Sequence, residues 1–426
     1  MTPSGPDRGA PATEPSAAQP AQFLYTERAH LMCPHMCFGI ALSIDRPYDA
    51  ALLQSAVDRL ADAHPFLKAL LGRDAASGAY TYRVTERSQA ELLLMRAELP
   101  GADSPEVLEA FRRLTGRDWD LLREGMLKIA AWRMGEQTCL LLVFHHLLAD
   151  GRGALGLAEE LADCYALGRT PAFAPERLIA SLEDMPAKAR MPLVSRLLIR
   201  SANRRWARER QRVSYEAYHS FADQFLCADA VRCTLTRVSA EELGAMRQAC
   251  HAHGVSVNDV LVARRMAEDG VRRLIIACDL RSRLAVYRAG ALGNYSTAFS
   301  VEVRQKEKDL YALAQAVHRQ VQRTMNRPAA LWLVLQCYAR LDPGLLDAAF
   351  LSCRGGFPSE AGKFIGSLFF GFGAASGHSI TNLGSITSES IASAYFLPPA
   401  SPAIRKIQGV LTVNGVMTIC TCERPG

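Results

Sequence analysis

The amino-acid sequence predicts an α/β fold in two lobes. The chain has 426 residues, of which 49% are hydrophobic, so it can bury two cores of ordinary size. Strand-like and helix-like segments alternate on both sides of a stretch rich in proline and arginine, which indicates two mixed layers of sheet and helix joined by a crossover. The expected divisions are a leader at 1–20, an N-terminal lobe at 21–167, a crossover at 168–215 and a C-terminal lobe at 216–426.

Composition excludes several classes of protein. The leader is rich in proline, alanine, glycine and serine and has no apolar core of signal-peptide length, so we expect it to be disordered. The longest apolar runs fall short of the roughly 20 residues that a membrane-spanning helix needs, so no span is expected. The twelve cysteines are scattered without CxxC or Cys/His zinc spacing, which favours reduced, mostly buried thiols in a cytoplasmic protein.

The first lobe begins with the strand-like segment "CFGIALSID". An amphipathic helix follows, with Asp49 as its N-cap and Pro65 as its stop. After it come the strand-like "AYTYRV", the helical "SPEVLEAFRRLTG" and two strands separated by "GEQ", "MLKIAAWRM" and "TCLLLVFHH". Apolar residues then recur at helical spacing from Ala154 to Tyr165, so the two histidines close a strand and Asp150 opens a helix.

The crossover contains a basic segment, "RLLIRSANRRWARERQR", with seven arginines between Arg196 and Arg212. A solvated helix face is the ordinary outcome of such a run, and docking of a phosphate-bearing cofactor or an acidic carrier protein is the alternative. Nucleic acid is not expected as a partner, because the segment has one tryptophan and no interleaved aromatic residues.

The second lobe restarts with the strand "RCTLTRV" and a helix opened by a capping box of Ser239 and Glu242. The helix "VNDVLVARRMAEDG", the strands "VRRLIIACDL" and "YSTAFSVEV" and a helix at 309–326 follow. The last hundred residues are predicted to be mainly strands, with a tight hairpin turn at Asn414 and Gly415.

Chemistry concentrates in "VFHHLLADGRG", residues 143–153. Histidine is the side chain whose ordinary pKa suits proton removal at neutral pH, so a histidine at a strand end is a natural general base. Asp150 lies too far along the chain to share that proton, but paired with an arginine it can fix the geometry of the loop. A bare HxxxD arises by chance in about every second protein of this size, whereas the longer HHxxxDG arises in roughly one in a thousand, so the longer form is the informative one.

Three other chemistries are less favoured. A metal bound by His145, His146 and Asp150 is disfavoured, because adjacent residues at a strand end point to opposite faces. A Ser-His-Asp hydrolase would carry GxSxG after a strand, and the sequence has none. A thiol nucleophile would sit in an electropositive turn beside a histidine, and no cysteine does so in the sequence.

"HHLLADG" resembles the HHxxxDG motif of the condensation-domain superfamily. That superfamily is built like chloramphenicol acetyltransferase and includes non-ribosomal peptide condensation domains, free-standing polyketide-associated acyltransferases, wax ester synthases and plant-type acyltransferases. Further segments resemble it from about residue 21 to the end: "DAALLQSAVDRLADAHPFLKALL", "GVSVNDVLVA", "IIACDLRSR", "LGNYSTAFSVEV", "SITNLGSI" and "GVLTVNGVMTICTC". The plant-type motif DFGWG is replaced by "FFGFG", with Phe369 and Phe372 at the Asp and Trp positions, which argues against a close plant-type relative.

The resemblance implies two chloramphenicol-acetyltransferase-like lobes with an active-site tunnel between them. It implies that His146 points into the tunnel as the base, while Asp150 turns away to pair with an arginine. Arg281 is the first choice for that arginine and Arg283 the second. His145 is then a packing or orienting residue, with an auxiliary role in the tunnel as the alternative.

Three more residues are candidates for supporting roles. Gly151 would keep the tunnel wall thin or supply a positive φ that a side chain would resist. Asn294 in "LGNYS" and Ser385 in "NLGSI" are candidates for stabilising the oxyanion of a tetrahedral intermediate, although a turn-forming asparagine is the commoner interpretation of the first.

The implied function is acyl transfer from a thioester to a hydroxyl or amine, in secondary-metabolite or lipid biosynthesis. No permanently bound cofactor or metal is expected, and the donor would be acyl-coenzyme A or an acyl group on the phosphopantetheine of a separate carrier protein. The sequence holds no carrier-protein or adenylation domain, which predicts a free-standing enzyme, and a chain that encloses its own site is expected to be a monomer. The alternative is a non-catalytic module that recruits a carrier protein or partner enzyme; the intact His146 and Asp150 favour catalysis.

Overall fold

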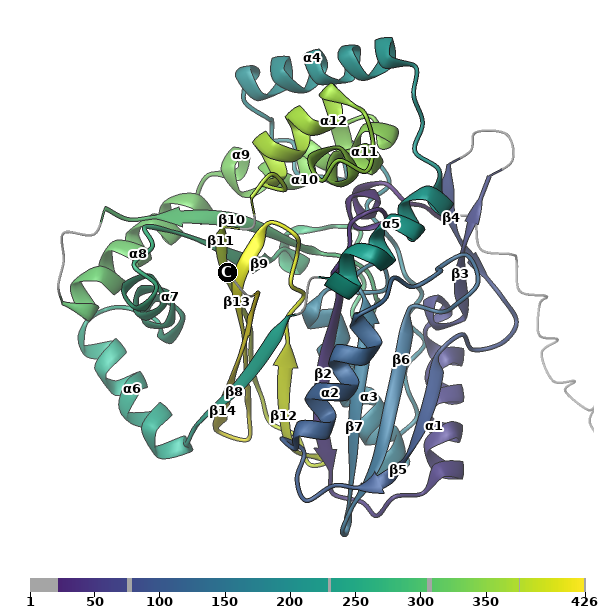
Figure 1. Ribbon diagram of the computed structural model, residues 1–426. Coiled ribbons are helices and arrows are strands. Elements are labelled where there is room, and N and C mark those ends of the chain that lie inside the picture. The colour runs from purple at the N-terminus through teal and green to yellow at the C-terminus, as the bar shows by residue number, and fades with distance from the viewer. Residues whose placement is uncertain (1–21, 75–78, 229–230, 305–308, 375, 425–426) are drawn as a thin grey trace, which may run out of the picture.

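The structure is a computed structural model that describes residues 22–424 except 75–78, 229–230, 305–308 and 375, so the predicted leader lies outside the described residues. Two larger mixed sheets flanked by helices confirm the predicted fold class (Figure 1). Buried hydrophobic side chains form two clusters. Within the described residues no helix combines the length and apolar character needed to cross a bilayer.

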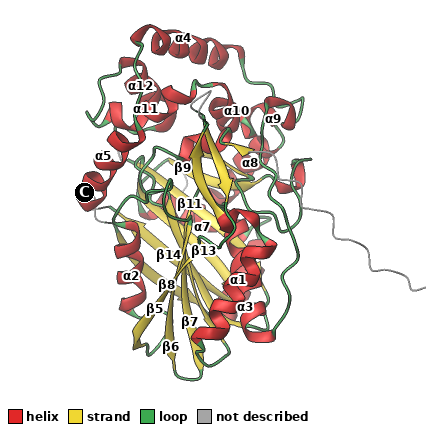
Figure 2. Ribbon diagram, turned by 90° about the vertical axis from the view of Figure 1, so that its right-hand side faces the viewer, coloured by secondary structure: helices red, strands yellow, loops and turns green. Residues whose placement is uncertain are grey.

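The first sheet has five strands in the order β12-β2-β7-β6-β5. They are β2 (Cys37–Ile44), β5 (Glu91–Glu98), β6 (Leu127–Met134), β7 (Gln137–His145) and β12 (Ile391–Leu397). Its helices are α1 (Ala50–Ala63), α2 (Pro105–Thr115) and α3 (Gly151–Leu167). α1 and α3 pack together on one face and α2 covers the other (Figure 2). Edge strand β12 comes from the second half of the sequence, so the C-terminal part of the chain completes the sheet that carries the histidines.

The second sheet has six strands in the order β10-β9-β11-β13-β14-β8. They are β8 (Arg232–Val238), β9 (Arg273–Asp279), β10 (Ser296–Glu302), β11 (Gly377–Ile386), β13 (Ile404–Val413) and β14 (Val416–Glu423). The helices beside it are α6 (Ala240–Ala252), α7 (Val257–Glu268) and α8 (Leu310–Met325). β11 runs parallel to β9 and β13, and the other neighbours are antiparallel.

Local sequence signals placed many of these elements correctly. Asp49 caps α1 by accepting from the backbone N–H of Leu52. Ser239 and Glu242 form the predicted capping box of α6. Asn414 and Gly415 both have positive φ, as a tight hairpin turn between β13 and β14 requires.

Helices cover one end of both sheets (Figure 1). They are α4 (Leu193–Glu209), α5 (Tyr215–Ala228), α9 (Pro328–Leu331), α10 (Leu333–Arg340), α11 (Pro343–Cys353) and α12 (Glu360–Ile365). A small third sheet contains β1 (Gln22–Phe23), β3 (Ala69–Arg73) and β4 (Tyr80–Val84). The 3-10 helix η1 (Thr26–His30) and the π-helix η5 (Gly366–Phe370) complete the elements used below.

The prediction that the last hundred residues are mainly strands is wrong for 328–370, which form α9 to α12 and η5. These helices are short. Many of their apolar side chains are buried, because the helices lie between the sheets and α4. Short buried helices show little helical periodicity, so their apolar runs resemble strands. Helix α5 was also not predicted from the sequence.

One cysteine pair departs from the expectation of free thiols. Cys233 on β8 and Cys422 on β14 lie opposite each other in the strand register, with Cα atoms 4.2 Å apart, and form a disulfide. The other ten cysteines are free. The two partners are 189 residues apart in sequence, and only the strand pairing brings them together.

Candidate active site

The loop that follows β7 is held on both sides by the first sheet. β7 lies between β2 and β6, and its last residue is His145. The His145 backbone N–H donates to the Met126 carbonyl at 2.9 Å, and the His146 N–H donates to the Met36 carbonyl at 2.8 Å. Neighbouring strands therefore fix where the side chain of His146 begins.

Asn294, in the turn before β10, fixes the tautomer of His146. Its Nδ2 donates to the His146 backbone carbonyl at 2.6 Å, and because a carbonyl only accepts, this bond sets the orientation of the amide. Its Oδ1 then faces Nδ1 of His146 at 2.6 Å. An amide oxygen also only accepts, so Nδ1 carries the proton and Nε2 keeps its lone pair. This arrangement prepares Nε2 as a proton acceptor.

His146 lines a cavity of about 620 Å³ between the two halves of the chain. The wall takes apolar side chains from the start of the chain, the second sheet and the covering helices, among them Met36, Phe299, Val334, Phe369 and Phe372. Among the described lining residues, Arg273 alone carries a permanent charge. Burial lowers the pKa of His146, although Asp150 and the hydrogen bond to Asn294 oppose the shift. The imidazole of His146 is therefore neutral at pH 7.

Asp150 is the N-cap of α3, and its carboxylate accepts five hydrogen bonds from four residues. Its Oδ1 accepts from the backbone N–H groups of Arg152 and Gly153 and from Arg281 Nη2 at 2.7 Å. Its Oδ2 accepts from Arg281 Nη1 at 3.0 Å and from the Tyr295 N–H at 2.9 Å. Burial raises the pKa of Asp150, but Arg281 and these N–H groups outweigh it and hold the pKa below its usual value. The carboxylate thus ties the histidine loop to the second half of the chain.

Gly151 lies in close contact with β11. A Cβ at this position would lie 2.6 Å from Cδ2 of buried Leu383 on β11. The alternative of a positive φ is wrong, because Gly151 is not among the positive-φ glycines. Its neighbour Arg152 donates to the Leu383 carbonyl, so α3 and β11 are in direct contact here.

Some predicted residues lie apart from the cavity. Arg283 does not contact Asp150; it is exposed and donates to the Met325 carbonyl. Ser385 is exposed on β11 and does not line the cavity with His146. His145 is buried and its Nδ1 accepts from the Leu147 N–H, so it packs and orients the turn. Burial and the neighbouring His146 lower the pKa of His145 to about 3.

The side chains of His145, His146 and Asp150 point to different partners and do not converge on one ion position. Among the described residues, one group of His, Cys, Asp or Glu atoms lies close enough for a shared ion: Cys233, Cys420 and Cys422. Two of these form the disulfide.

Sequence reasoning missed His30 at the end of η1. Its ring stacks on that of His146 with centroids 4.6 Å apart, and it lines the same cavity. No local pattern marks it, because the contact joins residues more than a hundred positions apart.

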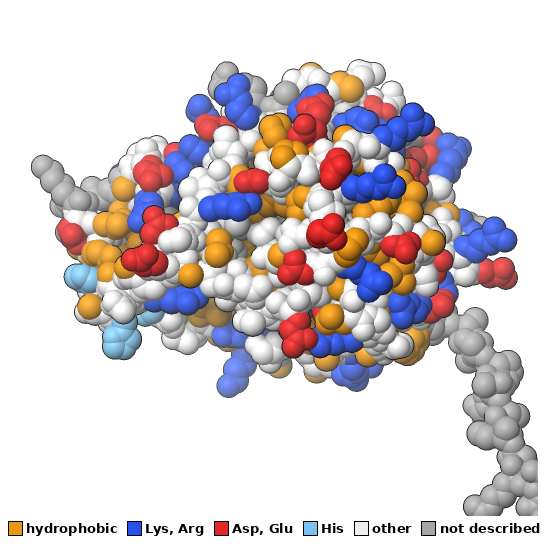
Figure 3. Space-filling view, turned by 90° about the horizontal axis from the view of Figure 1, so that it is seen from below, with side chains coloured by type: hydrophobic (Ala, Val, Ile, Leu, Met, Phe, Trp, Pro, Cys, Tyr) orange, Lys and Arg blue, Asp and Glu red, His pale blue; other side chains and the backbone are white. Residues whose placement is uncertain are grey.

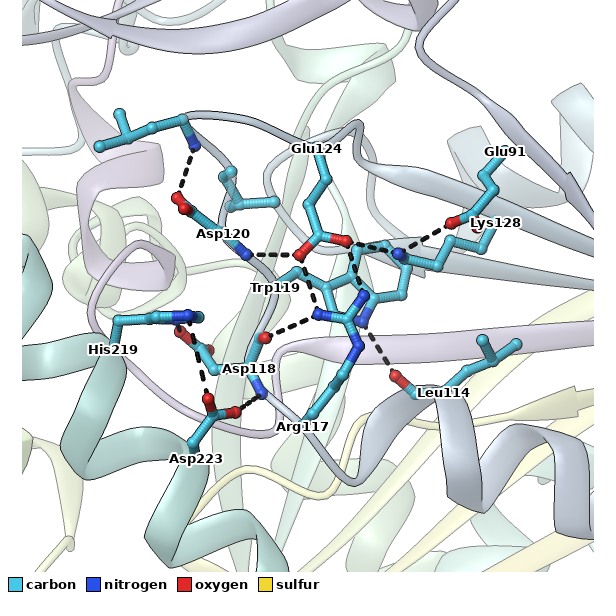
Figure 4. Close-up of polar contacts among 12 residues, drawn as sticks. Glu91, Leu114, Arg117, Asp118, Trp119, Asp120, Glu124, Lys128, His219 and Asp223 are labelled. Carbon is cyan, nitrogen blue, oxygen red and sulfur yellow. Dashed lines mark hydrogen bonds and ion pairs between the residues drawn. The ribbon is translucent and has the colours of Figure 1, made fainter.

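A polar network around the buried Lys128 lies near His145, and Figure 4 shows its residues. The Trp119 ring neighbours that of His145, and Lys128 Nζ lies 4.6 Å from the Trp119 ring centroid. Lys128 donates to Glu124 at 2.5 Å, and Arg117 makes a two-pronged contact with the same carboxylate. Burial raises the pKa of Glu124, but Arg117 and Lys128 outweigh it and lower that pKa to about 2. Through Lys128, the network holds β6 in place next to the loop that carries the histidines.

The variant Lys128→Met should lower the free energy of unfolding by about 2 kcal/mol, because Glu124 and Glu91 lose the charge-assisted hydrogen bonds of the buried ammonium. Glu124 stabilises the fold in its charged form above its usual pKa of 4.5, and this contribution is lost as the pH falls toward 2. The difference in free energy of unfolding between the wild type and Lys128→Met should therefore be smaller at acidic pH. Denaturant unfolding at pH 7 and pH 3 measures it, with Arg123→Met as a control at an exposed ion pair. Equal effects of both substitutions would contradict a structural role for the network.

Comparison with known proteins finds solved structures that share this fold. No protein-family model matches the sequence. The first condensation domain of the calcium-dependent antibiotic synthetase is similar, with TM-score 0.56 and 15% identity over 95% of this chain and 91% of that one. The chain has the condensation and epimerization domain fold. Polyketide synthase associated protein 5 from Mycobacterium tuberculosis also shares this fold, with TM-score 0.56 and 15% identity over 96% of this chain and 95% of that one.

The epimerization domain from the third module of tyrocidine synthetase B has the same condensation fold, with TM-score 0.53 and 13% identity over 94% and 88% of the two chains. In sequence, a protein described as a probable nonribosomal peptide synthetase, CymA of Salinispora arenicola, is 29% identical over 140 residues. That match covers 32% of this chain and 2% of CymA. The fold that the resemblance of "HHLLADG" implied is confirmed.

Proposed function

We propose that this protein is an acyltransferase that moves an acyl group from a thioester donor to a hydroxyl or amine, with His146 as the general base. The observation that carries the proposal is the pairing of His146 Nδ1 with Asn294, which leaves Nε2 without a partner among the described residues, on a side chain that lines a large cavity. Nε2 takes the proton of the hydroxyl or amine as its oxygen or nitrogen bonds to the acyl carbon. The acyl carbon–sulfur bond then breaks, and the thiolate recovers that proton.

Asp150 acts at a distance from the reacting atoms. Its oxygens are occupied by Arg281 and by backbone N–H groups, so its role is to position the loop and to favour the imidazolium that forms on His146. The apolar cavity wall favours an apolar acyl group over a charged one.

The donor is proposed to arrive on an acidic carrier protein that docks at α4. All seven arginines between Arg196 and Arg212 are exposed, and none forms an ion pair within the described residues. Leu193 and Val194 at the start of the helix are 67% and 69% exposed. α4 packs on α12, and the segment that follows α12 lines the cavity (Figure 1). The face seen in Figure 3, by contrast, mixes acidic and basic side chains.

The charge reversals R196E, R200E and R204E, four residues apart on one α4 face, should raise KM for an acyl-carrier donor about tenfold or more. KM for the same acyl group on coenzyme A should change much less. The matched control is R247E, R264E and R319E on exposed positions of α6, α7 and α8. Equal responses from the two triple variants would contradict docking at α4.

A survey of thioesters tests the proposed function. Purified protein is incubated with acetyl-, benzoyl- and octanoyl-coenzyme A and with the same acyl groups on carrier proteins, together with pooled amines and alcohols. Thiol release and product mass are followed, with His146→Ala as the blank. Product that needs His146 supports the proposal and identifies the donor class; folded protein that turns over no donor contradicts it.

The second candidate is a non-catalytic module that recruits a carrier protein or partner enzyme. The exposed arginines of α4 favour this second candidate, because they would bind an acidic partner whether or not the protein is an enzyme. A recruiting module would bind that partner equally well with and without His146 and would release no thiol.

A further inference from the structure

The ring of His30 lies beside the ring of His146 in the cavity. The two are stacked with centroids 4.6 Å apart and planes 17° apart, and both line the cavity wall. The ring of Tyr338 lies edge-to-face with that of His30, with ring centroids 6.1 Å apart. His30 is therefore part of the cavity surface rather than of the packed core.

The position of His30 is fixed by a buried ion pair between Arg28, in the same short helix, and Asp347 on α11. Arg28 Nε donates to Asp347 Oδ1 at 2.8 Å, and the second guanidinium nitrogen pairs with Oδ2. Both side chains are buried, and Asp347 lies on α11, one of the helices that cover the cavity. A group held in this way can present a hydrogen-bond donor without reorganisation.

The polar atoms of His30 are unused. Neither ring nitrogen has a hydrogen-bond partner within the described residues. Burial, followed by the neighbouring His146 and His145, holds the pKa of His30 well below its usual value. A neutral imidazole offers one N–H donor and one acceptor nitrogen, so His30 adds a donor to the cavity without competing for the charge on His146.

The two residues expected to stabilise an oxyanion do not meet that need. The Asn294 side chain bonds through both its oxygen and its nitrogen to His146, and Ser385 is exposed outside the cavity. In a thioester transfer the nucleophile attacks the carbonyl carbon, and the oxyanion forms on the oxygen bonded to that carbon. Its donor must therefore stand beside the base, which is where the stacked ring of His30 lies.

We propose that His30 donates a hydrogen bond to the oxyanion that forms on the thioester carbonyl while His146 takes the proton from the nucleophile. This inference rests on the proposed acyl transfer and names a second substrate-contacting residue for it. No covalent bond forms or breaks at His30; its N–H stays in place while negative charge develops on the carbonyl oxygen. The carbonyl double bond then re-forms, and the charge leaves with the thiolate.

Two variants separate the donor from the stacked ring. His30→Phe keeps an aromatic ring against His146 and Tyr338 but removes the N–H, whereas His30→Gln keeps an N–H but removes the aromatic ring. If His30 donates to the oxyanion, His30→Phe should lower kcat about 100-fold to 1,000-fold with KM nearly unchanged. His30→Gln should recover at least a tenfold part of that loss.

The assay is thiol release from octanoyl-coenzyme A with pooled acceptors, on variants whose melting temperatures match that of the wild type. Full activity in His30→Phe, or no recovery in His30→Gln, overturns the inference. If wild type and His146→Ala are both inactive or equally active, the proposed transfer itself fails and this inference fails with it. If activity is lost in His146→Ala but kept in His30→Phe, the proposed acyl transfer stands and only the role of His30 is overturned.

Discussion

His146→Ala should lower kcat for acyl transfer by about 100-fold to 10,000-fold, the usual contribution of a general base, and should leave the fold intact. The side chain is partly exposed to the cavity, so its removal leaves little buried polar surface without a partner. Thiol release and circular dichroism on the same preparation measure the two effects. Loss of activity together with loss of folding would show a structural residue instead.

The pH dependence of the same reaction follows from the burial of His146. Because burial lowers the pKa of His146, the neutral base persists below the ordinary histidine value of 6.5. The kcat/KM of the wild type should stay level from pH 8 to 6.5 and fall only in more acidic solution. If the residual kcat/KM of His146→Ala falls at the same acidic pH as that of the wild type, a group other than His146 causes the fall.

Asp150→Ala should lower the free energy of unfolding by about 3 kcal/mol, because the mostly buried guanidinium of Arg281 loses its buried carboxylate and keeps only the more exposed Asp279. Roughly 1 kcal/mol of this comes from the lost N-cap of α3. Arg281→Met should cost a similar amount, and the double variant should cost less than the sum of the two. Denaturant unfolding measures all three.

Arg283→Met provides the matched control for this pair. Arg283 lies two residues from Arg281 but is exposed and contacts a backbone carbonyl, so its loss should change stability by less than about 0.5 kcal/mol. Strict additivity of Asp150→Ala and Arg281→Met would contradict a coupled pair at this site.

The sequence predicts what local chemistry determines. Asp49 and Ser239 mark helix starts because each cap satisfies N–H groups within three residues. The apolar run before His145 marks a strand that ends there because β7 is buried at every residue after Gln137. The link from Asp150 to Arg281 was expected from the family resemblance, since nothing in the spacing of two residues 131 positions apart shows it.

Long-range packing explains what the sequence did not predict. His30 enters the cavity because Arg28 pairs with Asp347, a contact across 319 positions. Strand β12 joins the first sheet beside β2, although its neighbours in sequence, β11 and β13, belong to the second sheet. The disulfide between Cys233 and Cys422 likewise depends on strand register rather than on spacing.

The most direct test of this account is the tautomer of His146, measured by ¹⁵N NMR of protein labelled in its histidine rings and assigned by the loss of signals in His146→Gln. At pH 7.5 the account predicts a protonated Nδ1 bonded to Asn294 and an unprotonated Nε2 that is free to accept a proton. A protonated Nε2, or a charged ring at this pH, would contradict it.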